Sequence, residues 1–88
     1  MRYLYSIGII ILFSTATAFA QSNLLQSVKR NPKEAAALCR QFQSLNSQGI
    51  SASSKDAIEE ISRQRNLSTT DAEILSIYVI GLHCPEVN

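Results

Sequence analysis

One apolar stretch limits what this chain can fold into. Residues 71–84, with the sequence DAEILSIYVIGLHC, are the most apolar part of the chain apart from its first 20 residues. Read as a helix, the stretch has one face with the i, i+3, i+4, i+7 spacing: Leu75, Tyr78, Val79 and Leu82, flanked by Ile74 and Ile77. The opposite side is a narrow stripe of Glu73, Ser76, Ile80 and His83, so we expect the rest of a single small domain to wrap this helix.

The first 20 residues have the three parts of a secretory leader. An arginine stands at the second position, a short apolar run covers residues 7–13, and Ala-Phe-Ala at 18–20 forms a cleavage site before Gln21. A membrane anchor is the alternative, but an uninterrupted span needs about 18 to 20 apolar residues. We therefore predict a signal peptide over residues 1–20 and an exported, periplasmic or extracellular domain over 21–88.

The charges of the exported part balance. The chain has eight Lys and Arg residues against seven Asp and Glu residues, and the leader contains one of the arginines, so seven of each sign remain. Nucleic-acid binders and polybasic membrane binders need an excess of positive charge. We therefore expect no nucleic-acid partner. Because no second apolar segment approaches the length of a span, we also expect no stable membrane span after cleavage. The cluster of Lys29, Arg30 and Lys33 is interpreted as a solvated helix end, with an anionic contact site as the alternative.

A helix is predicted to begin at Pro32. Asn31 suits the N-cap, Pro32 suits the first turn, and Glu34 is placed to reach back to the cap. Gly49 then ends the helix in the left-handed conformation, and Ile50 is expected to fold back onto the core. One face of this helix is apolar and consists of Ala35, Leu38, Cys39, Phe42 and Leu45.

A second helix is predicted to end at Asn66. Ser53, with Asp56 three residues later, forms its cap. Its inward side chains are Ala57, Ile58 and Ile61, joined by Leu67. On its outer face Glu59 and Arg63 have the i, i+4 spacing of an ion pair.

The ends of the central helix can also be predicted. One of two capping boxes, Ser68–Asp71 or Thr70–Glu73, begins it, and Pro85 stops it, which places Cys84 at or just past its end. Residues 21–30 suit a short helix or an ordered arm, while the last three residues are expected to contribute little. No segment alternates like a strand. The predicted fold class is all-α, a small bundle of three main helices plus the short N-terminal one.

Cys39 and Cys84 are the only cysteines of the chain. An even count in a small exported domain predicts a disulfide. A redox pair usually has Cys-x-x-Cys spacing, and nothing nearby supports a metal site. Closing a loop of about 46 residues contributes on the order of 4 kcal/mol.

No catalytic constellation is apparent. His83 adjoins Cys84, but a nucleophile pair needs a free thiolate and a third orienting group. Glu59 and Glu60 are adjacent and so do not share a helix face. No nucleophile elbow, metal-ligand spacing or phosphate-binding loop is present in the sequence. We expect the protein to have no enzymatic activity, no cofactor and no metal. The alternative is a hydrolase or redox enzyme, which free thiols would favour.

Three other features have structural interpretations. Residues 66–68 match the glycosylation sequon, but Asn66 also suits a helix end. Phe42 and Tyr78 are expected in the core, with the lining of a small apolar pocket as the alternative. Gly81 would let another backbone approach closely near the disulfide.

Three short motifs, Ala37-Leu38-Cys39, Gly49-Ile50 and the closing His83-Cys84-Pro85, resemble those of small secreted helical proteins of unknown function common in actinobacteria. The resemblance covers residues 32–85 and implies export, few helices and one bridge, with no catalytic residues to transfer. The start of the central helix, STTDAE, followed by YVIGL, points to a separate group of cyanobacterial type. In size, leader and single bridge the chain also resembles the small periplasmic acid-stress chaperones.

The sequence thus predicts a non-enzymatic exported interaction or binding module. Its partner would be an unknown protein or a small apolar ligand. The alternative is a periplasmic stress chaperone of the small helical type, which would open its apolar core near about pH 2 to 3.

Overall fold

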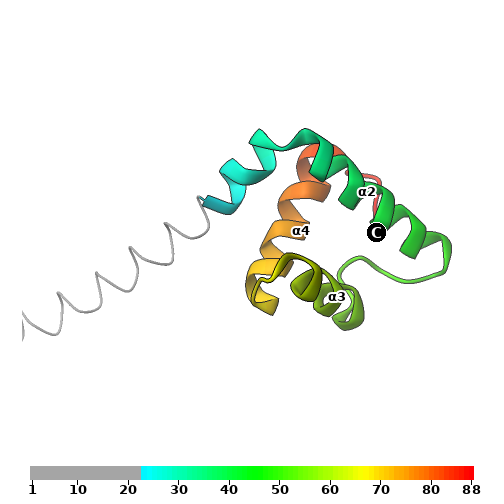
Figure 1. Ribbon diagram of the computed structural model, residues 1–88. Helices are drawn as coiled ribbons and strands as arrows, with labels where there is room; N and C mark the ends of the chain where they lie inside the picture. Colours follow the sequence, from blue (N-terminus) through cyan, green and yellow to red (C-terminus); the bar gives the residue numbers. More distant parts are fainter. Residues whose placement is uncertain (1–22) are drawn as a thin grey trace, which may run out of the picture.

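The computed structural model describes residues 23–88, which contain four helical segments and no strand (Figure 1). They are a helix over residues 23–30, α2 (Pro32–Ser47), α3 (Lys55–Arg65) and α4 (Thr69–His83). The predicted all-α class with one disulfide is confirmed. The predicted leader, residues 1–20, lies outside the described residues. None of the helices searched in residues 23–88 is long and apolar enough to cross a membrane.

The helix α4 is the centre of the bundle. It packs against α3 at one end and against α2 at the other, and in Figure 1 it rises between them. The largest fully buried side chains come from all three helices and from the residue after α4: Phe42, Ile61, Val79 and Cys84. The core therefore lies between α4 and its two partners, as the apolar character of residues 71–84 predicts.

The buried face of α4 differs in part from the predicted one. Leu75 and Val79 are buried, but Leu82 is 51% exposed and Ile77 is 60% exposed. Ser76, predicted on the opposite side, is buried, and its hydroxyl donates to the main-chain oxygen of Ala72 at 2.8 Å. Because apolar residues surround most of α4, their periodicity does not select a face, and α2 and α3 leave part of its surface uncovered.

The start of α2 is at Pro32 as predicted, but the predicted capping box is wrong. The side-chain amide of Asn31 donates to the main-chain oxygen of Ser27 at 2.9 Å, so it closes the preceding helix and does not cap α2. Glu34 forms an ion pair with Arg65 at the end of α3. The side chain of Asn31, which the sequence pattern assigns to α2 alone, therefore holds the junction between residues 23–30 and α2.

The end of α2 follows the prediction at Gly49, which has a φ of 79°. The amide of Ile50 donates to the main-chain oxygen of Leu45 at 2.9 Å, which closes the last turn. Ile50 itself is 37% exposed, so its predicted return to the core is wrong. The space around Gly81 is also open, with nothing within 4 Å of a Cβ built there, and the predicted close backbone approach is not found.

The cap of α3 is one residue later than predicted. The hydroxyl of Ser54 accepts from the amide of Ala57 at 3.3 Å, whereas the hydroxyl of Ser53 is 2.9 Å from that of Ser51. Asn66 ends the helix with a φ of 54°, in agreement with its structural interpretation. The inward side chains of α3 are those predicted: Ala57, Ile58 and Ile61 are buried, and Leu67 is partly buried against the core.

The ion pair predicted on α3 is wrong, and the start of α4, for which the sequence left two alternatives, is settled. Arg63 pairs with Glu60 at 3.0 Å and not with the predicted Glu59. The hydroxyl of Ser68 accepts from the amide of Asp71 at 3.1 Å, so the first of the two alternative boxes begins α4. Cys84 lies just past the end of α4, as Pro85 predicts.

The last residues contribute more than predicted. Val87 is buried in the core cluster, and the amide of Asn88 donates to the side-chain oxygen of Asn46 at 2.7 Å. The side-chain amide of Asn46 in turn donates to the main-chain oxygens of Asn88 at 2.9 Å and of Ile50 at 3.0 Å. The side chain of Asn46 in α2 therefore joins Ile50, which follows the helix, to the C-terminal residue Asn88.

Asn46→Ala is expected to lower the free energy of unfolding by about 1.5 to 2 kcal/mol, because three hydrogen bonds to main-chain groups are lost at once. Urea unfolding followed by circular dichroism measures the loss. Gln43→Ala on the same helix is the matched control, since it removes a single exposed bond of 2.8 Å to Glu86 and should change the stability by less than about 0.5 kcal/mol. Equal effects of the two substitutions would show that the C-terminal segment is not held by Asn46.

Candidate functional site

The two cysteines join the middle of α2 to the end of α4. Cys39 and Cys84 are bonded, with their Cα atoms 6.0 Å apart and both residues buried. No cysteine is free. His83 is exposed in the last turn of α4. The adjacent cysteine and histidine therefore have no thiol for nucleophilic chemistry while the bond is intact.

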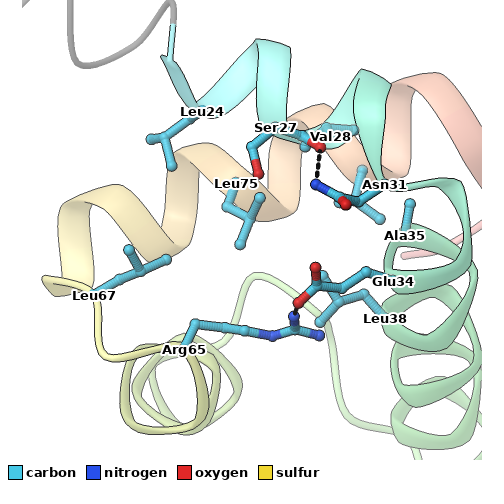
Figure 2. Close-up of a pocket in the computed structure, with 11 residues that line it drawn as sticks. Leu24, Ser27, Val28, Asn31, Glu34, Ala35, Leu38, Arg65, Leu67 and Leu75 are labelled. Carbon is cyan, nitrogen blue, oxygen red and sulfur yellow. Dashed lines mark hydrogen bonds and ion pairs between the residues drawn. The ribbon is translucent and has the colours of Figure 1, made fainter.

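A cavity of about 190 Å³ lies between residues 23–30, the first half of α2, the end of α3 and α4 (Figure 2). Its apolar lining comes from residues 23–30, α2, the turn between α3 and α4, and α4, and consists of Leu24, Val28, Ala35, Leu38, Leu67, Leu75 and Val79. An apolar cavity of about 150 Å³ is large enough to bind benzene. The space therefore matches a small organic molecule.

The helix over residues 23–30 covers this cavity from one side. Val28 is 3% exposed, and Leu24, one turn earlier on the same face, is partly buried. A helix of this length is marginal in water by itself. Its position over the cavity therefore depends on these two side chains and on the bond from Asn31 to Ser27.

Four polar residues form the rest of the lining, which we call the polar rim: Ser27, Asn31, Glu34 and Arg65. Figure 2 shows Glu34 of α2 and Arg65 of α3 pointing toward one another across the opening, where they form an ion pair. The side chain of Arg65 is 23% exposed, whereas that of Glu34 is 51% exposed. The rim thus places one mostly buried cation and one half-exposed anion beside an apolar space.

Sequence reasoning missed most of this site. Phe42 is fully buried and Tyr78 is partly buried against the core, and neither lines the cavity. The lining comes from aliphatic residues that the sequence assigns to ordinary packing. No local pattern relates Glu34 to Arg65, because they are far apart in the chain and meet only when α2 and α3 are in place.

A second hollow lies between the starts of α3 and α4 and has a volume of about 360 Å³. Its lining is mostly polar and consists of Ser53, Lys55, Ile58, Glu59, Thr69, Thr70 and Glu73. Ile58 is its one aliphatic residue, so this hollow lacks the group of aliphatic side chains that lines the cavity. Within residues 23–88, no three His, Cys, Asp or Glu side chains are grouped so that they could hold a metal ion.

The geometry supports binding of an apolar molecule with a polar end at the rim. A family model with the description Domain of unknown function (DUF8664) matches residues 25–84, a range that includes both cysteines and every residue that lines the cavity except Leu24. No curated protein and no solved structure matches the chain.

Proposed function

This chain belongs to the family described as Domain of unknown function (DUF8664), and from its own structure we propose that it binds a small apolar molecule in the cavity beneath residues 23–30, without catalysing a reaction. The observation that carries the proposal is the apolar cavity, whose seven aliphatic side chains come from four segments of the chain. Ligand sites are typically concave and apolar with a few polar groups that orient the ligand. The cavity and its polar rim have both parts.

The size of the cavity sets the expected affinity. Burial of an alkyl chain gains about 0.8 kcal/mol for each CH₂ group, and the loss of translational freedom offsets part of the gain. A molecule with about six carbons gains at most about 5 kcal/mol in this way, so its Kd should be about 1 mM or weaker. This is a measurable affinity for a probe, and polar contacts at the rim would strengthen it.

We place this binding outside the cytosol. The leader pattern over residues 1–20 and the bonded pair Cys39–Cys84 support export, because disulfides persist in oxidising compartments. The resemblance to small secreted helical proteins, with a start of α4 of cyanobacterial type, supports the same location. The protein would then act as a soluble carrier or sensor of its ligand after cleavage.

Titration of the isotope-labelled protein with hexan-1-ol, followed by amide chemical shifts, tests the proposal. We expect shifts at Leu24, Val28, Leu38 and Leu75, with a Kd of about 1 mM or weaker. Ala35→Leu adds three carbons at a buried position of the lining and should weaken binding at least tenfold by filling the space.

Ala36→Leu is the matched control, since Ala36 is the next residue of α2, is exposed and does not line the cavity. It should bind hexan-1-ol as the unsubstituted protein does. Shifts absent from the cavity residues in the unsubstituted protein, or equal weakening by both substitutions, would contradict the proposed function.

The stress chaperone is a second candidate, favoured by the exposed Ile77 and Leu82 on α4. Apolar side chains that face solvent can bind unfolded clients, and acid would enlarge this surface by loosening the core. Client protection and dye binding near about pH 3 test this candidate. A protein that stays closed and protects no client there would leave the cavity as the functional site.

A further inference from the structure

The polar rim indicates what kind of apolar molecule the cavity takes. We infer that the ligand is a small anionic amphiphile, an apolar body of roughly six carbons with one carboxylate, and that this carboxylate replaces Glu34 as the partner of Arg65. The inference rests on the proposed function and adds the chemical class of the ligand.

The two members of the ion pair differ in how easily they can part. The side chain of Arg65 is 23% exposed, less than half as exposed as that of Glu34, so loss of its anionic partner costs more than the return of Glu34 to water. The side chain of Glu34 is 51% exposed and can return to water at little cost, since pairs this open to solvent contribute little. An anion can therefore exchange for Glu34.

The guanidinium of Arg65 also has more N–H donors than its pairing with Glu34 uses. It presents five N–H groups in a planar fork that matches a carboxylate. Among residues 23–88, its pairing is with one oxygen of Glu34. A ligand carboxylate that uses two donors of the fork gains the stronger bidentate geometry.

The apolar lining is on the same side as this fork. In Figure 2 Arg65 and Glu34 reach into the space bordered by Leu67, Leu75 and Leu38. A molecule with its body among the leucines therefore has its end group at the rim. A cationic end group would have to displace Arg65 from Glu34 and leave the more buried charge unpaired, so amines should be excluded.

Three probes with the same six-carbon chain test the inference: hexanoate, hexan-1-ol and hexylamine. Amide chemical shifts of the unsubstituted protein should give a Kd for hexanoate at least tenfold below that for hexan-1-ol, and hexylamine should bind more weakly than either. Binding of all three with equal affinity, or tightest binding of hexylamine, would overturn the inference while leaving the proposed cavity in place. Absence of binding by all three would instead contradict the proposed function.

Two substitutions should change hexanoate affinity in opposite directions. Glu34→Gln keeps the side-chain shape but removes the competing charge, and should tighten hexanoate binding about threefold. Arg65→Met keeps an apolar stem and should weaken hexanoate binding at least tenfold, because a charge-assisted pair is lost. The dispersion of the amide chemical shifts, which should match that of the unsubstituted protein in both variants, serves as the control for folding. Weaker hexanoate binding by Glu34→Gln would show that Glu34 is not the group that the ligand replaces.

Discussion

Replacement of both cysteines by alanine is expected to lower the free energy of unfolding by about 4 kcal/mol. Cys39 and Cys84 close a loop of about 46 residues, which removes chain entropy from the unfolded state. Small domains have total stabilities of only about 5 to 15 kcal/mol. The loss is therefore most of the stability at the lower end of this range, and urea unfolding followed by circular dichroism measures the difference.

Alanine is the appropriate replacement because both positions are buried and alanine introduces no polar group. Reductant provides the control: it should destabilise the unsubstituted protein to the level of the double variant and leave the double variant unchanged. A loss below about 1 kcal/mol would mean that packing around α4, and not the bond, supplies most of the stability.

The second large effect is expected for Phe42→Ala, which should cost about 3 to 5 kcal/mol. Phe42 is 0% exposed and lies on the face of α2 that packs toward α4, so its removal leaves a cavity in the core. The unfolding midpoint in urea should fall accordingly. If the loss exceeds the total stability of the protein, the variant will be unfolded without denaturant, which also agrees with the prediction.

Ile77→Ala is the matched control for this core substitution. Ile77 is a large apolar side chain on α4, but it is 60% exposed, so its truncation should change the stability by less than about 0.5 kcal/mol. A cost comparable with that of Phe42→Ala would show that the solvent-facing side of α4 is covered in solution.

The apolar pattern predicted the buried face of α2 better than that of α4. Lys33, Arg40 and Gln43 lie off the apolar face of α2, which makes this face easy to recognise. Its residues Ala35, Leu38, Cys39 and Phe42 are buried as expected. α4 is apolar around most of its surface, so the pattern placed Leu82 inward although it is exposed. Which side of such a helix is buried depends on how many neighbours the rest of the chain can supply.

Local side-chain signals identified some helix boundaries and failed at others. Asn66 and Ser68 lie at the helix boundary where the sequence places them, with the expected conformations and bonds. Asn31 and Glu34 have the pattern of a cap, yet they bond Ser27 and Arg65. The site could not be predicted from sequence because its lining and its ion pair form only when four separate segments meet.

The claim that a ligand binds beneath residues 23–30 is tested most directly by a crystal structure of the protein under xenon pressure. Apolar cavities of this size take up xenon. We predict a xenon atom among Val28, Leu38 and Leu75. Side chains of residues 23–30 packed onto α4 so that they fill this space, with no xenon between them, would contradict the claim.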